Sequence, residues 1–273
     1  MKLSECVRLF AEAGVDSPRY DAEEIFINIG GFGITECKLE DPSSDNPRLL
    51  DAVSRRRNRE PLQYILGFAD FYRERYEVNP NCLIPRSDTE ILVDLAVRMI
   101  PEGENFLDLC TGSGCVGIST LKNTKGTRAT LVDISEGALE LAKRNALANG
   151  VSDRAEFSLA DVFTYTPKRE YFAILSNPPY LSGEEYEGLE REIYFEPKIA
   201  FLGGADGMDF YRSIVSKMGD YLKEGGFFAF EIGYSEEEKI RAVGAEWGFS
   251  VEVFKDLSSN TRVALLKRCA TDK

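Results

Sequence analysis

The sequence predicts an α/β fold in which a parallel sheet follows an N-terminal helical region and a β-hairpin. Three observations indicate this. From residue 85 onward, short apolar segments alternate with amphipathic ones, as strands and crossover helices do in parallel sheets. One apolar segment runs into a glycine-rich turn, and another runs into two consecutive prolines. Residues 1–59 instead carry apolar side chains at helical spacing.

The first 60 residues are expected to form helices. Leu3 and Phe10 belong to one helical face, and Ser17 before Pro18 is typical of the start of a second helix. A third helix is predicted over residues 47–59. It ends in a basic run that is either a solvated helix end or a contact with a partner or nucleic acid, namely Arg55, Arg56, Arg57 and Arg59.

Residues 61–84 are predicted to form a β-hairpin that links two domains. We expect one strand over 64–66 (YIL) and the other over 71–78 (FYRERYEV). A helix should begin near Ser87, because Ser87 and Glu90 have the spacing of a capping box. The predicted regions are therefore a helical domain over 1–60, the hairpin linker over 61–84 and an α/β domain over 85–273.

A glycine-rich turn follows the first strand of the α/β domain, residues 105–109 (NFLDL). Gly112, Gly114 and Gly117 make a G-x-G-x-x-G pattern, which lets the backbone approach a ligand at a helix N-terminus. The next strand, 128–132 (RATLV), ends in Asp133, and an acid about twenty residues beyond such a turn accepts hydrogen bonds from ribose hydroxyls. The domain is therefore predicted to bind a cofactor that contains a nucleoside.

The fourth strand, 171–175 (YFAIL), is followed by Ser176, Asn177, Pro178, Pro179 and Tyr180. Proline cannot donate to a sheet ladder and has a fixed φ, so the strand must end in a rigid bracket. The Asn177 side-chain oxygen and the Pro178 carbonyl could accept both N–H groups of a planar amide or an exocyclic amine, while Tyr180 could stack on its π face. A Pro-Pro turn without chemistry is the alternative.

Composition excludes several classes of function. The chain contains no histidine, which removes imidazole catalysis and His-ligated metals. None of the six cysteines lies in a C-x-x-C pair, so we expect no bound metal. Scattered free thiols also indicate that the protein works in a reducing cytoplasm. No apolar run is long enough to cross a membrane. The net charge of −13 argues against stable binding to nucleic acid.

These motifs resemble those of class I methyltransferases, and more closely those of the HemK/PrmC family, the peptide-chain release factor glutamine methyltransferases. The resemblance covers nearly the whole chain and includes SPRYDAE, EPLQYILG, LIPRSDTE, DLCTGSGCVG, SNPPY, FEP, GGADGMDFYR and FEIG. It implies a helical substrate-recognition domain and a seven-stranded Rossmann-like sheet with one reversed edge strand. It also implies that S-adenosylmethionine is the cofactor and S-adenosylhomocysteine the product. The substrate would be the glutamine of the Gly-Gly-Gln loop of class I release factors, and we expect a cytoplasmic monomer.

The same resemblance, together with the motifs, assigns site residues. Asp108 is expected at the amino-acid end of the cofactor, Asp133 and Ile134 at the ribose, and Asp161 and Val162 at the adenine. The glycine loop would consist of Cys110, Thr111, Gly112, Ser113 and Gly114. The substrate amide would be held by Asn177, Pro178, Pro179, Tyr180 and Glu196, and the catalytic residues among them would be Asn177, Pro178 and Tyr180. Asn177 would also contact the cofactor. Cys110 stands where glycine is common in the family, and Val162 where a larger side chain is common.

Three other functions stay open. A ribosomal-protein glutamine methyltransferase would share the chemistry, a DNA or RNA amino-methyltransferase would use the bracket on a flipped base, and a cofactor-sensing scaffold would leave the bracket incidental. Residues 182–196 are rich in acids and form either a solvated surface segment or a mobile flap that attracts a basic partner loop.

Overall fold

The computed structural model describes residues 1–256 and 258–269, so residues 257 and 270–273 of the predicted 85–273 domain lie outside it. The chain divides into two compact units. The helical unit comprises Met1–Phe68 and Glu190–Glu196, and the sheet unit comprises Ala69–Leu189 and Pro197–Lys273. Within the described ranges, no helix combines the length and apolar character that a membrane span needs.

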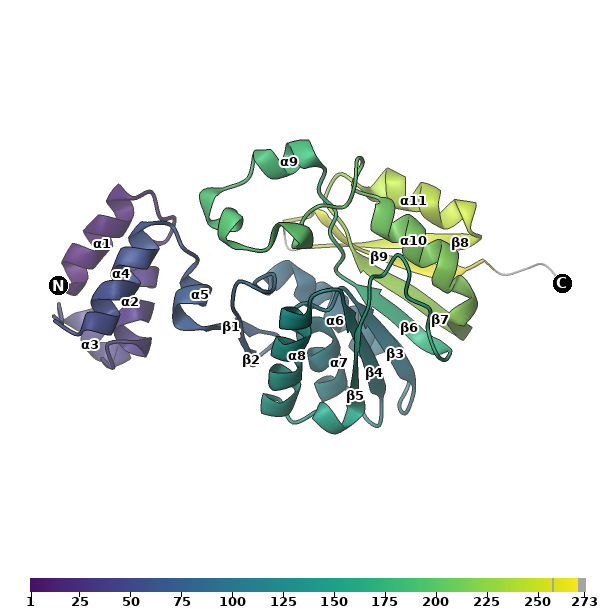
Figure 1. The fold of residues 1–273 in the computed structure, drawn as a ribbon, viewed down its shortest axis with the longest axis horizontal. Coiled ribbons are helices and arrows are strands. Elements are labelled where there is room, and N and C mark those ends of the chain that lie inside the picture. Colours follow the sequence, from purple (N-terminus) through teal and green to yellow (C-terminus); the bar gives the residue numbers. More distant parts are fainter. Residues whose placement is uncertain (257, 270–273) are drawn as a thin grey trace. The chain divides into compact units, whose positions relative to one another are not determined.

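The helical unit is built from helices α1 to α5 (Figure 1). α1 (Leu3–Glu12), α2 (Pro18–Asn28) and α4 (Pro47–Arg57) confirm the expected helices, whereas the short α3 (Ile34–Leu39) was not predicted. Their apolar faces meet in one core that includes Leu3, Phe10, Ile25, Phe26, Leu49 and Val53. The helical spacing seen in the sequence therefore reflects burial in this core.

The prediction of a first hairpin strand over 64–66 is wrong, because Leu62–Leu66 forms the helix α5. A short apolar run fits a buried strand and a buried helical turn equally well. Its neighbours decide the outcome: Pro61 occupies the N-cap, and Gly67 ends the helix with a φ of 82°, a left-handed conformation that glycine adopts readily.

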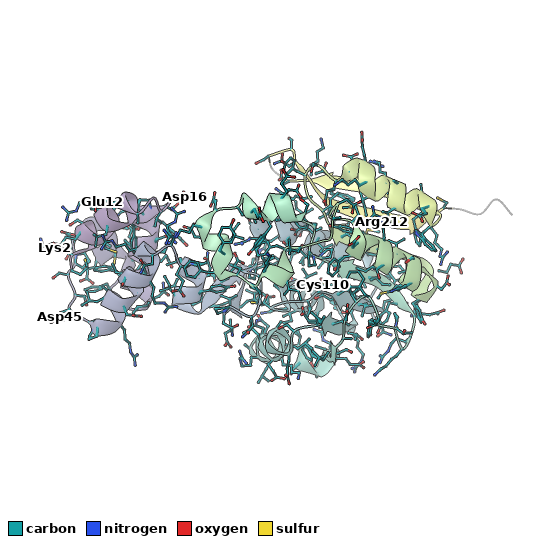
Figure 2. The ribbon with its side chains drawn as sticks, turned by 45° about the horizontal axis from the view of Figure 1, so that its top comes forward. Lys2, Glu12, Asp16, Asp45, Cys110 and Arg212 are labelled. Atoms are coloured by element: carbon teal, nitrogen blue, oxygen red, sulfur yellow. The ribbon has the colours of Figure 1, made fainter. Side chains whose placement is uncertain are left out.

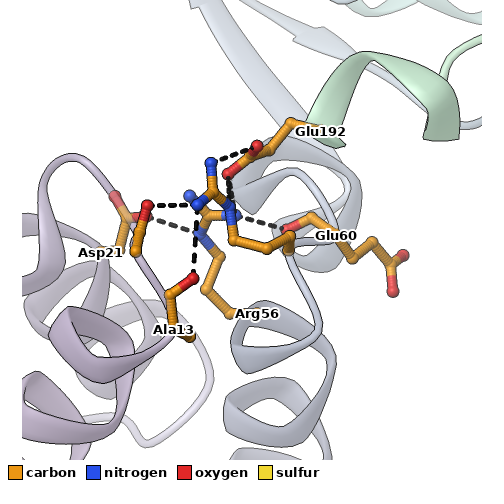
Figure 3. A network of polar contacts seen from close by, with 7 residues as sticks. Ala13, Asp21, Arg56, Glu60 and Glu192 are labelled. Atoms are coloured by element: carbon orange, nitrogen blue, oxygen red, sulfur yellow. Dashed lines mark hydrogen bonds and ion pairs between the residues drawn. The ribbon is translucent and has the colours of Figure 1, made fainter. Parts of the chain in front are cut away.

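Three arginines of the basic run, Arg55, Arg56 and Arg59, are paired inside the helical unit (Figure 3). Arg56 donates from Nε to Asp21 Oδ2 at 2.6 Å and from Nη1 to Glu192 Oε1 at 3.2 Å. Arg59 donates to both carboxylate oxygens of Glu192, and Arg55 forms a two-pronged ion pair with Glu60. The expectation of a solvated helix end is thus wrong for Arg56, which is buried.

One acid of the 182–196 stretch belongs to this network. Glu192 lies in the 3-10 helix η3 (Arg191–Phe195), and burial alone would raise its pKa, but the hydrogen bonds from Arg59 hold that pKa below its ordinary value. Glu185 is engaged locally, since its carboxylate accepts from the backbone and hydroxyl of Ser182 at the start of α9 (Gly183–Glu187). A fully solvated segment is therefore the wrong description for Glu192, and electrostatic steering by the remaining acids stays a prediction.

The sheet unit contains a seven-stranded sheet in the order β5-β4-β3-β6-β7-β9-β8. Its strands are β3 (Asn105–Leu109), β4 (Arg128–Asp133), β5 (Ala155–Leu159), β6 (Tyr171–Ser176), β7 (Leu222–Glu231), β8 (Phe249–Lys255) and β9 (Thr261–Arg268). The pairs from β5 to β7 are parallel, and β9 runs antiparallel to both β7 and β8. The Rossmann-like sheet is confirmed, although the reversed strand is β9, next to the edge.

Helices cover both faces of this sheet (Figure 1). One face packs against α6 (Glu90–Met99), α7 (Cys115–Asn123) and α8 (Glu136–Ala148), and the other against α10 (Asp209–Met218) and α11 (Glu237–Glu246). Neighbouring strand residues alternate between the two cores. Phe106 belongs to the first, while Leu107 and Leu109 belong to the second.

The hairpin exists, but it is shorter than predicted. Its strands are β1 (Phe68–Phe71) and β2 (Glu74–Glu77), so the predicted strand 71–78 wrongly includes the last residue of β1 and the turn between the two strands. Tyr72 and Arg73 form this turn with φ values of 49° and 67°, without glycine or asparagine. The Tyr72 amide donates to Glu90 Oε1 at 2.8 Å, so Glu90 holds this turn, and the expected capping box with Ser87 does not form.

Candidate functional site

A cavity of about 480 Å³ opens at the carboxyl ends of the sheet strands. It lies where the strand order reverses between β3 and β6, which is the usual ligand position in open α/β sheets. Its volume is typical of small-molecule sites. The predicted site residues among its lining are Asp108, Cys110, Thr111, Gly112, Ser113, Asp133, Ile134, Asp161, Val162, Asn177 and Pro179.

The glycine-rich turn between β3 and α7 forms one wall of the cavity. Cys110, Gly112 and Gly114 all have positive φ, at 56°, 54° and 82°. Gly114 does not line the cavity; a Cβ there would lie 2.6 Å from Ile118 Cδ1 and 3.1 Å from Ala142 Cβ, so this glycine permits close packing of α7 on α8. Of these three residues with positive φ, Cys110 (Figure 2) is the one that is not glycine, and its left-handed backbone is a conformation that glycine adopts more readily.

Asp108 lies beneath this turn with almost no exposed surface. Its Oδ2 accepts from the Thr111 hydroxyl and, at 3.0 Å, from the Gly117 amide. A Cβ at Gly117 would lie 2.8 Å from the same oxygen, so the third glycine makes room for the carboxylate. Burial raises the pKa of Asp108 to about 7, although both hydrogen bonds oppose that rise. Asp108 therefore organises the turn, and contact with a cofactor is an additional role that stays a prediction.

Asp133 closes the next strand tip. Its carboxylate accepts from the Gly112 amide at 2.8 Å and the Ser135 amide at 2.9 Å, which ties the glycine turn to the start of α8. Burial raises the pKa of this carboxyl, while the backbone hydrogen bonds counteract that effect. The neighbouring Ile134 is exposed and presents an apolar surface to the cavity. The carboxylate could accept hydrogen bonds from ribose hydroxyls, and the apolar surface could pack against the attached base.

The loop after β5 supplies a second apolar wall. Asp161 holds this loop by accepting from the Phe163 amide at 2.8 Å, and Val162 is buried. The Phe163 ring is partly exposed at the cavity and lies 4.8 Å from the Phe210 ring, centroid to centroid. Phe163 therefore offers an aromatic surface next to Val162.

The proline bracket follows β6 directly. The Ser176 hydroxyl donates to the Leu109 carbonyl at 2.7 Å, which joins the tips of β6 and β3. Asn177 and Pro179 line the cavity, Pro178 is buried outside its lining, and Tyr180 packs beside the second sheet core. Burial raises the Tyr180 pKa above its ordinary value, so the phenol is neutral. Stacking of Tyr180 on a substrate stays a prediction.

Two glycines of the GGADG turn fit against the bracket. A Cβ at Gly203 would lie 2.5 Å from the Pro179 carbonyl oxygen, and one at Gly207 would lie 2.3 Å from the Tyr180 carbonyl oxygen. The Leu181 amide and carbonyl bond to Phe201 and Gly203, both at 2.8 Å. This turn therefore supports the bracket from behind, which gives the motif a structural role.

Sequence reasoning missed Thr89, which also lines the cavity, and Glu231, which is buried behind it. Asn177 Nδ2 donates to the Thr89 hydroxyl at 3.3 Å, and that hydroxyl donates to the Glu231 carboxylate. The only signal in the sequence was their presence in LIPRSDTE and FEIG. Glu196, by contrast, is buried in the segment assigned to the helical unit and is absent from the cavity lining, so its role toward substrate stays a prediction. Among the described residues, no cluster of three Cys, Asp or Glu side chains could hold a metal.

Comparison with known proteins identifies both parts of the chain. Residues 2–67 match the family model of the PrmC N-terminal domain, and residues 87–194 match that of the methyltransferase small domain. The fold of the sheet unit also occurs in a methyltransferase from Pyrococcus furiosus, which is 20% identical with a TM-score of 0.53 over 71% of this chain and 89% of that one.

Two curated relatives carry the resemblance across nearly the full length. The release factor glutamine methyltransferase of Fusobacterium nucleatum subsp. nucleatum is 34% identical over 97% of this chain and 77% of its own. That of Neisseria gonorrhoeae is 39% identical over 86% of each. This chain therefore belongs to the family of release factor glutamine methyltransferases.

Proposed function

We propose that this protein transfers a methyl group from S-adenosylmethionine to the side-chain amide nitrogen of the glutamine in the Gly-Gly-Gln motif of class I release factors. The observation that carries the proposal is that Asn177 lies on the wall of the same cavity as Asp133 and the glycine turn. A nitrogen held at Asn177 would therefore meet a cofactor held by the strand tips. Family membership supports the choice of substrate.

The cavity suits this cofactor in its chemistry. Asp133 offers a carboxylate for ribose hydroxyls, Phe163 and Ile134 offer apolar surface for adenine, and the turn around Asp108 would receive the amino-acid end. S-adenosylmethionine supplies a methyl group on a positively charged sulfur, so no metal is needed for the transfer.

The reaction is an in-line displacement. The nitrogen lone pair forms the new C–N bond as the C–S bond breaks, sulfur keeps that electron pair, and the methylated amide loses one N–H proton to solvent. An amide nitrogen is a weak nucleophile because its lone pair is delocalised. Acceptors at the Asn177 oxygen and the Pro178 carbonyl would stabilise the positive charge that develops on this nitrogen, which lowers the barrier without tightening ground-state binding. The remaining contribution is alignment of the reacting atoms.

We propose that the helical unit recognises the release factor. We also propose that the protein acts as a monomer in the cytoplasm. The role of the helical unit is supported by the match of residues 2–67 to the PrmC N-terminal domain. The net charge of −13 disfavours a nucleic-acid substrate, which would need phosphate contacts.

Methyl-labelled S-adenosylmethionine tests the proposal. The protein is incubated in parallel with a release factor, ribosomal proteins, DNA and RNA, and the label is located by mass spectrometry. We expect label on the glutamine of Gly-Gly-Gln and none there when this residue is replaced by alanine. Label confined to a ribosomal protein or to a nucleic-acid base would overturn the assignment.

A further inference from the structure

Two hydrogen bonds link Asn177 of the bracket to Thr89, which also lines the cavity, and Thr89 to the buried Glu231. Asn177 follows β6, Thr89 ends the 3-10 helix η1 (Ser87–Thr89), and Glu231 is the last residue of β7. Asn177 Nδ2 donates to Thr89 Oγ1 at 3.3 Å, and Thr89 donates in turn to Glu231 Oε2. Thr89 is 1% exposed and Glu231 3% exposed, so water does not compete for these partners.

The direction of these two hydrogen bonds follows from how many protons each group carries. An ionised carboxylate can only accept, so the single proton of the Thr89 hydroxyl is directed to Glu231. The lone pairs of that hydroxyl then face Asn177 and can accept only from an amide NH₂. This arrangement leaves the Asn177 oxygen for the cavity that Asn177 lines.

We propose that Thr89 and Glu231 are positioning residues for methyl transfer, because together they hold the Asn177 amide with its oxygen toward the nitrogen to be methylated. The inference rests on the proposed function and deepens it. A reversed Asn177 amide would place an N–H donor against the N–H groups of the substrate glutamine. That arrangement cannot stabilise positive charge on nitrogen, so the reversed form would be inactive.

The charge state of Glu231 should therefore affect turnover. Burial raises its pKa to about 7, and the hydrogen bond from Thr89 only partly opposes this. A protonated Glu231 could donate to Thr89, whose own proton would then favour the reversed amide. Glu231 interacts electrostatically with six ionisable groups around it: Arg86, Asp88, Cys115, Tyr180, Tyr211 and Arg262. Burial raises the pKa of the thiol and both phenols, so they stay neutral near pH 7.

Substitution of Thr89 tests the inference directly. Thr89→Val keeps the shape and removes the hydroxyl, whereas Thr89→Ser keeps the hydroxyl. We expect Thr89→Val to lower kcat about 10- to 100-fold, as loss of one buried polar partner would. Affinity for S-adenosylhomocysteine, measured by calorimetry, should change less than about threefold, and Thr89→Ser should recover most of kcat.

Thr130→Val is the matched control. Thr130 on β4 is a buried threonine whose hydroxyl accepts from Tyr171 at 2.9 Å, and it lies outside the cavity lining. It should lose stability, as Thr89→Val does, but keep kcat. Equal kcat in Thr89→Val and the wild type, or an equal fall of kcat in Thr130→Val, would overturn the positioning role.

A second variant keeps the inference testable if Thr89→Val does not fold. In the wild type, kcat should rise with pH through about 7 as Glu231 ionises, and in Glu231→Gln this rise should disappear. A pH profile that is identical in both proteins would contradict the inference. A wild-type protein that fails to methylate any release factor would instead contradict the proposed function, so the two failures are distinguishable.

Discussion

Two buried polar clusters, one in each unit, differ in how their charges are balanced. In the helical unit, the carboxylates of Asp21 and Glu192 are paired with the guanidinium groups of Arg56 and Arg59 (Figure 3). In the sheet unit, the described hydrogen-bond donor to the Glu231 carboxylate is a neutral hydroxyl, that of Thr89. Arg262 lies close enough to lower the Glu231 pKa, but its ion pairs are with Asp88 and Asp256.

The difference shows what each cluster contributes. Matched charges with good geometry hold the helices and the 190–196 segment of the helical unit together. A buried carboxylate that is hydrogen-bonded by a neutral hydroxyl and whose pKa stays raised despite Arg86 and Arg262 costs stability when it ionises, and it is kept where its orientation serves the reaction. The helical cluster should therefore respond to substitution mainly in folding, and the sheet cluster mainly in turnover.

The largest effect is expected from Arg56→Ala. The substitution leaves Asp21 buried without its partner, and breaking such a pair costs about 3–5 kcal/mol of unfolding free energy. Urea unfolding would measure this. Arg212→Ala is the control: Arg212 (Figure 2) pairs with Asp206 at the surface, where loss of an ion pair costs less than about 1 kcal/mol. Equal losses in the two variants would contradict the distinction.

The second-largest effect is expected from Asn177→Ala, which should lower the rate of methyl transfer. Removal of the acceptor is expected to lower kcat about 100- to 1,000-fold, as loss of one transition-state hydrogen bond does elsewhere. The dissociation constant for S-adenosylhomocysteine should stay within about threefold, because Asp133 and the glycine turn are intact. Cofactor affinity that fell as steeply as kcat would assign Asn177 to cofactor binding alone.

The third effect is a pH-dependent gain in stability for Glu231→Gln. The folded-state pKa of Glu231 is about 7, above its ordinary 4.5, so the folded protein binds this proton more tightly than the unfolded chain. This contribution is fully present below pH 4.5 and is lost as pH rises through 7. The variant should therefore match the wild type near pH 4 and exceed its stability by up to about 3 kcal/mol at pH 8. Urea unfolding at both pH values is the measurement, and a difference independent of pH would contradict the buried charge.

The smallest effect concerns the strained backbone of the glycine turn. Cys110 has a φ of 56°, so Cys110→Gly should be about 1 kcal/mol more stable than Cys110→Ala, the reverse of the order at an ordinary position. Both variants lose the same thiol, so the comparison isolates the backbone. An alanine variant that is the more stable of the two would contradict a left-handed Cys110.

Local patterns were enough to predict much of the sheet unit. The strands 105–109, 128–132 and 171–175 were predicted correctly to within one residue, because each is a short buried run followed closely by a glycine-rich turn, an acid or a pair of prolines. The cavity lining also contains most of the predicted cofactor residues. These features depend on neighbours in the sequence, which a pattern can register.

Other features depend on contacts between distant segments. The Tyr72–Arg73 turn lacks the usual residues, and Glu90 stabilises it from α6. Thr89 and Glu231 are 142 residues apart, and Arg59 and Glu192 are 133 residues apart. Nothing in the single sequence indicates that these side chains meet.

The most direct test of the account is a crystal structure with S-adenosylhomocysteine and a peptide that contains Gly-Gly-Gln. We predict that the glutamine nitrogen lies within hydrogen-bond distance of the Asn177 oxygen, with the nucleoside at Asp133. A complex in which that nitrogen faces away from Asn177, or in which the nucleoside occupies another part of the sheet unit, would contradict the central claim.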